Sequence, residues 1–324
     1  MKLGLMLAIG AGALDGGRTA RWVDLREIAR TAEAVGFERL FVPDHLLFRS
    51  SPPENHIQVS MSEGRTRGIW EAWTILAALA EATERVQLGP LVACSSFRNP
   101  AVFAKMADTL DEVSGGRVIL GLGSGWHEPE YDAFGLPYDH RVGRFEEALQ
   151  IIVPLLRQGH VDFEGQYYQA RDCELTPRGP RPTGLPIMIG AIRPRMMRLT
   201  AQYADIYDAD YQLDSAEVDK RFRDLDVACT KVGRDSSSVE RTAGLRMALG
   251  ATLPPGATSA GEGLAAFELD GMRQDARLGT ADALIEHIRT FESVGVEHLT
   301  VAVPYPTGPK GVEALAPIVD AVHG

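Results

Sequence analysis

The pair Asp44-His45 follows directly after a short apolar segment, Arg39–Val42. A histidine can exchange a proton near neutral pH, and an adjacent carboxylate can fix its charge or orientation. Aspartate is also common where a helix begins, so the pair could simply cap the next segment. We favour a catalytic or ligand-binding role for His45, with Asp44 beside it, because reacting groups of α/β barrel enzymes lie just after strands.

A second candidate is the glycine-rich run Gly121-Leu122-Gly123-Ser124-Gly125, followed by Trp126. A dinucleotide-binding fingerprint would need a glycine where Trp126 stands, so that interpretation fails. Small residues such as Gly123 and Ser124 would instead let a flat ligand approach the backbone. The alternative is a tight turn with no role in binding.

A third candidate is the turn Gly190-Ala191-Ile192-Arg193, which opens into a helical pattern containing Arg195 and Arg198. Amide groups at a helix N-terminus and the positive end of its dipole bind anions. The chain carries a net charge of -11, so a local group of arginines is notable. The turn therefore predicts a phosphate site, and the alternative is an ordinary helix start with exposed arginines.

These residues share a position at the ends of short apolar segments that alternate with amphipathic helical patterns. The apolar segments are Leu3–Ile9, Arg39–Val42, Val86–Val92, Val118–Leu122, Pro186–Ile189, Ala204–Asp208, Arg241–Leu249 and His298–Val303. The helical patterns are Ala20–Val35, Ala72–Thr83, Ala101–Val113, Val142–Leu156, Arg195–Tyr203, Ala216–Val232, Ala281–Val294 and Gly311–Val322. Eight such units in one chain predict a (β/α)8 TIM barrel of class α/β, formed as a single domain over residues 1–324.

Two long stretches interrupt this alternation after the second and seventh strands, at about residues 49–68 and 251–279. Because both follow strands, we expect them over the barrel mouth, as lids or walls of a substrate pocket. The second contains a helical-looking patch at Leu264–Met272. A third interruption, His160–Ala170, is typical of a small surface hairpin that turns at Glu164-Gly165.

The composition excludes several classes of function. A net charge of -11 argues against a nucleic-acid or anionic-membrane partner. The eight histidines are scattered, and only His45 and His127 fall at the expected barrel mouth, so we predict no metal site. No G-x-S-x-G elbow occurs, which argues against a serine esterase. Three widely spaced cysteines form no CxxC pair, and we expect reduced thiols in a cytoplasmic protein.

Taken together, these features make the sequence similar to the luciferase-like monooxygenase family of flavin- and deazaflavin-dependent barrels, from the first strand through the last helix. The segments that carry the resemblance are FVPDH (Phe41–His45), EAWTILAALAEAT (Glu71–Thr83), VQLGPLVACSSFRNP (Val86–Pro100), GGRVILGLGSGW (Gly115–Trp126), RFEEALQIIVPLL (Arg144–Leu156) and PIMIGAIRPRMMRLTAQYADIY (Pro186–Tyr207). The Gly-Ser-Gly-Trp segment and the Pro-Arg-Met-x-Arg-Leu helix are most similar to the F420-dependent oxidoreductases of the family.

The resemblance implies a deazaflavin or isoalloxazine ring across the barrel mouth and its phosphate at Gly190-Ala191. It places His45 beside the ring and Asp44 on the same strand end. It also implies a cis peptide bond, within a residue, at Leu91-Val92, which would back the ring. Sugar-phosphate dehydrogenases of the family use an acidic glutamate where Trp126 stands. That departure implies a more apolar or aromatic substrate, with Trp126 in the reaction site.

The function implied is hydride exchange between coenzyme F420 and a small, apolar or aromatic organic substrate. The alternative is an FMN-dependent, oxygen-using monooxygenase supplied by a separate flavin reductase. A further alternative is a structural or accessory barrel without cofactor, in which Trp126, Tyr207 and Tyr211 would fill the mouth. The resemblance also favours a homodimer.

Overall fold

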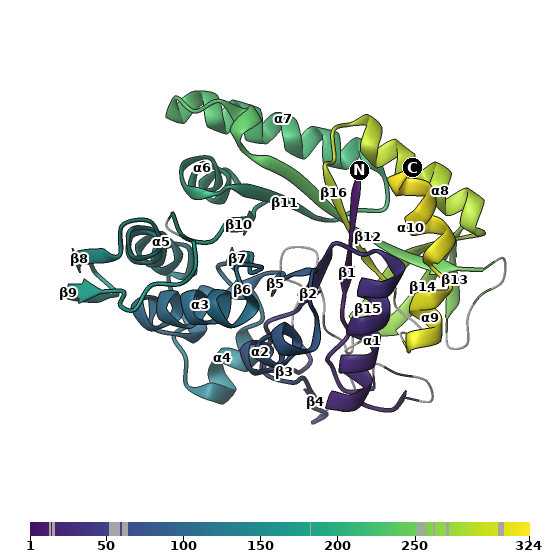
Figure 1. Ribbon diagram of the computed structural model, residues 1–324, viewed down its shortest axis with the longest axis horizontal. Helices are drawn as coiled ribbons and strands as arrows, with labels where there is room; N and C mark the ends of the chain where they lie inside the picture. Colours follow the sequence, from purple (N-terminus) through teal and green to yellow (C-terminus); the bar gives the residue numbers. More distant parts are fainter. Residues whose placement is uncertain are drawn as a thin grey trace.

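The computed structural model describes residues 1–324 apart from 13, 15–16, 52–58, 60–63, 182, 251–252, 254–256, 262, 270–271 and 304–307. Its centre is a nearly closed barrel of parallel strands surrounded by helices (Figure 1), which confirms the predicted fold class. The barrel strands are β1 (Lys2–Met6), β2 (Arg39–Val42), β5 (Gln87–Pro90), β6 (Ala93–Cys94), β7 (Leu120–Gly123), β10 (Ile187–Gly190), β11 (Ile206–Tyr211), β12 (Glu240–Leu249) and β16 (His298–Ala302).

The order of hydrogen-bonded strands shows how the barrel closes. The path runs β5-β2-β1-β16-β12-β11-β10-β7-β6. β5 lies within the third predicted strand, Val86–Val92, and β6 follows just beyond its end, so the two strands occupy one strand position that is interrupted at Leu91 and Val92. Because both ends of the path belong to one strand position, the sheet returns on itself. An isolated parallel bridge between Leu88 and Val118 also joins β5 to the residues before β7.

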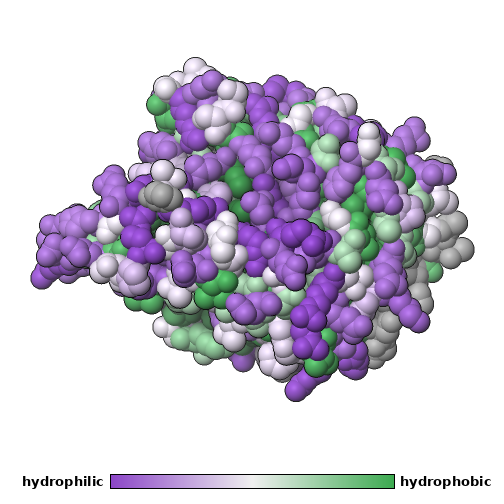
Figure 2. All heavy atoms as spheres, in the orientation of Figure 1, coloured by the Kyte–Doolittle hydropathy of each residue, from purple (hydrophilic) through white to green (hydrophobic). Residues whose placement is uncertain are grey.

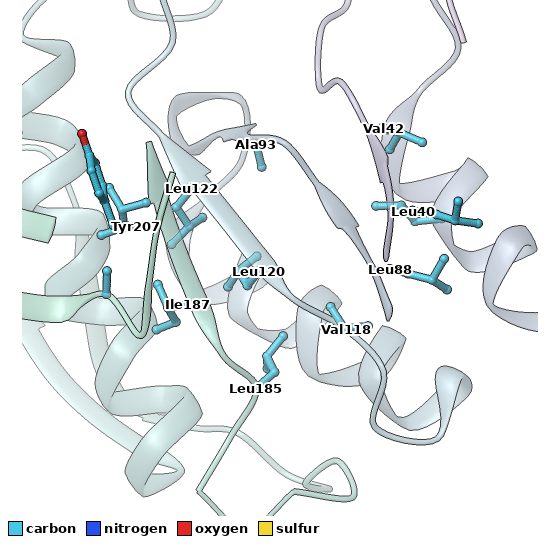
Figure 3. Close-up of a cluster of buried hydrophobic side chains, with 14 of the residues drawn as sticks. Leu40, Val42, Leu88, Ala93, Val118, Leu120, Leu122, Leu185, Ile187 and Tyr207 are labelled. Atoms are coloured by element: carbon cyan, nitrogen blue, oxygen red, sulfur yellow. The ribbon is translucent and has the colours of Figure 1, made fainter. Parts of the chain in front are cut away.

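Alternating residues of the strands face two different apolar layers. Leu40 and Val42 of β2 join the large core between strands and helices, whereas Phe41 between them packs with a separate cluster that includes Met188 and Ile206. This alternation with a period of two is what parallel barrel strands require. Figure 3 shows the outer layer, in which Leu40, Val42, Leu88, Leu120, Leu122 and Ile187 project from their strands.

The helices pack around the strands, and seven of those described begin and end within two residues of their predicted limits. The helix at Glu128–Phe134 was not predicted, and the predicted helix Gly311–Val322 is divided into two. The helices are α1 (Trp22–Val35), α2 (Ala72–Ala82), α3 (Pro100–Ser114), α4 (Glu128–Phe134), α5 (Arg141–Gln158), α6 (Pro194–Tyr203), α7 (Ser215–Val232), α8 (Ala281–Ser293), α9 (Pro309–Glu313) and α10 (Ala316–His323). Local capping fixes several starts: Asn99 accepts hydrogen bonds from the amides of Ala101 and Val102, and Asp214 does the same at α7.

The insertion after the seventh strand position differs from the sequence expectation. The patch Leu264–Met272 is not helical, because β14 (Leu264–Leu269) forms antiparallel pairs with β13 (Thr258–Gly261) and β15 (Met272–Gly279). β15 in turn pairs in parallel with β12, so the insertion adds its three strands to the sheet beside β12. The antiparallel pairing of β14 with β15 extends as far as Leu269 and Met272. Pairing across this hairpin outweighs the helical preference of the alanines and leucines.

Of the other two interruptions, the hairpin is confirmed, and the role of the first insertion as a lid stays a prediction. In the first insertion, β3 (Leu47–Phe48) pairs with β4 (Arg67–Gly68), and much of the remainder lies outside the described residues. β8 (His160–Glu164) and β9 (Gln169–Glu174) form the predicted hairpin, which projects from the barrel at the left of Figure 1. Hydrophilic side chains cover most of the face in Figure 2. No described helix is both long and apolar enough to cross a membrane.

Candidate active site

A cavity of about 680 Å³ lies at the carboxyl ends of the barrel strands. Eleven of the twelve predicted site residues line it: Asp44, His45, Leu91, Val92, Gly123, Ser124, Trp126, Gly190, Ala191, Ile192 and Arg193. The twelfth, Arg195, lines a neighbouring cavity instead. Segments far apart in the sequence therefore meet where a barrel enzyme holds its ligands.

The backbone between β5 and β6 forms one wall of this cavity. The peptide bond between Leu91 and Val92 is cis, as predicted. The side chain of Val92 reaches towards the neighbouring strands: a Cβ added to Gly123 would lie 2.6 Å from Val92 Cγ2, and one added to Gly190 would lie 3.8 Å from it. Bare backbone and a branched apolar side chain thus make a flat, nonpolar surface in the cavity wall.

The last glycine of the glycine run, Gly125, has a packing role of its own. Gly125 has a φ of 73°, and a Cβ there would lie 1.9 Å from Tyr131 Oη and 2.7 Å from Cys94 Sγ. Tyr131 and Cys94 contact each other at 2.8 Å in a buried position. The glycine at 125 is therefore required by packing against these two side chains and by its backbone conformation.

Asp44 lies in the cavity wall, but its carboxylate is occupied. It accepts hydrogen bonds from Arg98 Nη1 at 2.7 Å, Arg98 Nη2 at 3.0 Å and the amide of Cys94 at 3.0 Å. Burial raises the pKa of Asp44, and the Arg98 guanidinium and the Cys94 amide oppose that rise. Arg98 also donates to Glu71, the N-cap of α2. The aspartate therefore ties the end of β2 to the residues after the strand break.

His45 is oriented by a buried glutamate that the sequence analysis missed. Glu130 Oε1 lies 2.9 Å from His45 Nδ1, and Glu130 Oε2 accepts the amide of Leu46 at 2.8 Å. The side chain of Glu130 is 1% exposed. The His45 ring meets Trp126 edge-on at 5.4 Å between centroids and Phe48 at 4.6 Å. An imidazole fixed at Nδ1 can present Nε2 to a ligand in the cavity.

The predicted arginine group separates into two parts. Arg193 lines the main cavity, next to Ala191 and Ile192 at the start of α6. Arg195 and Arg198 both pair with Glu146 of α5 at 2.7 Å, so that one carboxylate offsets part of their charge. Only Arg193 is thus placed beside the predicted phosphate position.

Arg141 is a cavity residue that the sequence analysis did not single out. Its Nη1 donates to the carbonyl oxygen of Gly125 at 2.7 Å, and its guanidinium lies 4.2 Å from the centre of the Tyr138 ring. Arg141 lines both the main cavity and the neighbouring one, whose volume is about 650 Å³. The two cavities therefore adjoin at this side chain.

A family model described as luciferase-like monooxygenase matches residues 1–253, well over half of the 324 residues. The chain belongs to the luciferase-like monooxygenase family. The family predicted from the sequence is confirmed, and with it the assignment as an oxidoreductase-type enzyme.

Two relatives show the range of chemistry within this luciferase-like family. The chain is 32% identical over 246 residues to a phthiodiolone/phenolphthiodiolone dimycocerosates ketoreductase of Mycobacterium sp. (strain JLS), covering 73% of this chain and 63% of the relative. It is 34% identical over 176 residues to the pyrimidine monooxygenase RutA of Stutzerimonas stutzeri (strain A1501), covering 52% and 48%. The chain thus spans less than two thirds of the length of either relative.

Two solved structures of similar shape carry different cofactors. An F420-dependent secondary alcohol dehydrogenase in complex with an F420-acetone adduct has a TM-score of 0.77 and 18% identity, covering 99% of this chain and 98% of that one. A riboflavin lyase (RcaE) with modified FMN and substrate riboflavin has a TM-score of 0.78 and 14% identity, covering 99% and 91%. At these identities the similarity shows the fold of this luciferase-like chain.

The donor groups in the cavity suit a flavin-like ligand better than a metal ion. Among the described residues, no group of three or more His, Cys, Asp or Glu side chains is placed to hold a metal. A nonpolar wall at Leu91 and Val92, a helix start at Ala191 and a cation at Arg193 match a flat ring joined to a phosphate.

Proposed function

We propose that this chain is an F420-dependent oxidoreductase that exchanges hydride between the deazaflavin and a small, apolar or aromatic organic substrate. The observation that carries the proposal is the convergence of His45, Trp126, the Leu91-Val92 backbone and the Arg193 turn on one cavity at the strand ends. Structural neighbours that use F420 or carry FMN support the cofactor class.

Each part of the cavity has a distinct task in this proposal. The backbone at Leu91 and Val92, with Gly123 and Ser124 opposite, would hold the ring, and the amides of Ala191 and Ile192 with Arg193 would bind the phosphate. Asp44 would not act on the ring through its own charge. Its hydrogen bonds with Arg98 would keep the cavity wall beside the ring in position. When bound, the deazaflavin supplies the hydride chemistry, while the protein supplies position and protons.

His45 would provide the proton that accompanies hydride exchange. Glu130 holds Nδ1, so Nε2 is the atom that would donate to or accept from the substrate. The indole of Trp126 packs against the same imidazole ring and gives the substrate a flat apolar wall. Together they favour a substrate that has an aromatic or aliphatic body and a reacting polar centre.

We expect F420 to bind at least about tenfold more tightly than FMN, a difference of about 1.4 kcal/mol. F420 extends beyond its phosphate into a tail of carboxylates, and Arg141 lies where the main cavity adjoins a second one, in which Glu146 already pairs with Arg195. Arg141 is therefore the cation that we expect to meet the tail. Charge-assisted hydrogen bonds there would act on the longer ligand alone. Fluorescence titration with both oxidised cofactors at matched salt tests this. Tighter FMN binding would move the assignment to the monooxygenase.

Arg193→Ala is expected to weaken binding of both F420 and FMN by about tenfold, because both ligands carry the phosphate that Arg193 would contact. Arg198→Ala is the matched control: it removes the same charge one turn along α6, but Arg198 pairs with Glu146 and lines neither cavity. Equal losses in the two variants would mean that the phosphate lies elsewhere and that only the net charge matters.

The FMN alternative rests on the similarity to the pyrimidine monooxygenase. In that case reduced flavin would come from a separate reductase, and oxygen would be the second substrate. The cofactor-free alternative required the mouth to be filled. Tyr207 is instead buried in the core, Trp126 and Tyr211 line the cavity wall, and about 680 Å³ is left between the walls. A homodimer is also part of this proposal, and sedimentation analysis tests it.

A further inference from the structure

The end of β11 contains a bulge that brings an extra side chain into the cavity. Tyr207 and Ala209 are in the hydrophobic core, and Asp208 and Asp210, on the opposite face of the strand, line the cavity. Strict alternation would return Tyr211 to the core. However, Asp210 has a φ of 61°, and the register with β12 shifts between Asp208 and Tyr211. The bulge redirects Tyr211, which therefore lines the cavity as well.

The Tyr211 ring is held firmly in this position. It lies against the backbone of β12, where a Cβ added to Gly244 would come within 2.6 Å of Tyr211 Cδ1. The Arg246 guanidinium lies 4.4 Å from the centre of the ring. The hydroxyl oxygen of Tyr211 is buried and has no hydrogen-bond partner among the described residues. Burying a hydroxyl without a hydrogen-bond partner costs free energy, so a bound ligand that accepts a hydrogen bond from this hydroxyl would be stabilised.

The Asp208 carboxyl, which is 6% exposed, lies in the cavity wall with two hydrogen-bond donors at 3.2 and 3.3 Å from its oxygens. The amide of Asp210 donates to Oδ2 at 3.2 Å. Thr242 Oγ1 lies 3.0 Å from the carbonyl oxygen of Tyr207 and 3.3 Å from Asp208 Oδ1. The threonine has one hydroxyl proton to share between these two oxygens, so it compensates the buried Asp208 carboxyl only in part.

The charges around Asp208 act on its pKa in both directions: the Asp210 carboxylate raises it and the Arg221 guanidinium lowers it, and burial is the largest influence. Burial, reinforced by the Asp210 carboxylate, raises the pKa of Asp208 to about 7. The other charged groups near it come from neighbouring elements: Arg221 on α7, Arg246 on β12 beside Tyr211, and Arg193 at the start of α6. A carboxylic acid that keeps its proton at neutral pH can donate a hydrogen bond.

We propose that Asp208 and Tyr211 together bind a neutral hydrogen-bond acceptor of the substrate, such as a carbonyl oxygen, through their two O–H groups. This inference rests on the proposed function only in placing the substrate in the same cavity. β11 lies four positions from β2 along the barrel, so this acceptor site faces His45 from the opposite side. The substrate class is therefore a neutral aromatic or aliphatic compound that carries a carbonyl-type group.

Three probes of one shape test the proposal: acetophenone offers an acceptor, ethylbenzene offers none, and 1-phenylethylamine is a cation. Ligand-observed NMR titrations at pH 6, with the chain alone and with saturating F420, should rank acetophenone at least about tenfold above ethylbenzene. Tyr211→Phe should remove about tenfold of acetophenone affinity and leave ethylbenzene unchanged. Above pH 7 acetophenone should bind less tightly, because Asp208 then loses its proton.

Asp208→Asn separates the proton from the shape, since the amide donates at any pH: acetophenone affinity should persist and lose its pH dependence. Infrared difference spectra between this variant and the wild type should show a protonated carboxyl at pH 6 that disappears above pH 7. Tighter binding of the amine than of acetophenone at pH 6, or no effect of Tyr211→Phe, would overturn the inference. Failure of F420 to bind, with the ketone ranking intact, would overturn the proposed function alone.

Discussion

His45→Asn is expected to lower the turnover number by about 100-fold or more while leaving the melting temperature close to that of the wild type. Asparagine keeps an N–H that can donate to Glu130, which is buried and would otherwise lose its partner. It removes Nε2, the atom proposed to exchange the proton. Steady-state kinetics with reduced F420 and a ketone, together with thermal unfolding, measures both quantities.

Glu130→Gln is the companion variant, because it changes the orienting group and not the imidazole itself. A positioning role predicts a smaller loss, carried mainly by kcat, and an altered pH profile of kcat/KM. His45→Asn with full activity and lower stability would instead show that the pair is structural. In that case the buried carboxylate and the histidine simply fasten the loop after β2 to α4.

The strands and helices of the barrel were predictable because the hydrophobic pattern within each segment is enough to specify it. β2 occupies Arg39–Val42 as predicted, since a short apolar run between two polar turns has no other way to bury both faces. The prediction of a helical patch at Leu264–Met272 was wrong, because its alanines and leucines suit a helix or a strand. Which of the two forms depends on pairing between β14, β15 and β12. Such pairing is not visible in a local pattern.

The site was predictable where chemistry follows a strand directly, and not where the partner is distant in sequence. Asp44 and His45 could be located, but Glu130 lies 85 residues from His45 in the sequence. It reaches the imidazole only because α4 packs against the loop after β2. Arg195 was placed with the phosphate because the sequence could not reveal Glu146 on the neighbouring helix. Charge pairing between helices thus changed the role of a residue whose type and position were otherwise suggestive.

Arg98→Met is expected to lower the free energy of unfolding by roughly 3–5 kcal/mol, because it leaves the Asp44 carboxylate buried without its cation. The side chain of Asp44 is 1% exposed, and among the described residues the Cys94 amide alone would remain as a donor. Methionine preserves part of the packing of Arg98 against the rings of Trp73 and Phe103. Urea unfolding at pH 7 measures the loss, and Arg98→Met combined with Asp44→Asn should recover much of it.

The surface pair Arg18–Asp24 is a matched control for this experiment. Its two hydrogen bonds are 2.7 and 3.0 Å long, the same as those of the buried pair, and Asp24 also accepts one backbone amide. The side chain of Arg18 is 57% exposed, so water replaces it, and Arg18→Met should lower the free energy of unfolding by only about 0–1 kcal/mol. Removing Arg98 leaves burial to raise the pKa of Asp44 unopposed by that cation, so its destabilisation should grow from pH 5 to pH 8 as the uncompensated carboxylate ionises. Equal losses for the two arginines, or a loss independent of pH, would mean that Asp44 is not held as a buried ion. The strand end beneath the cavity would then owe its position to packing alone.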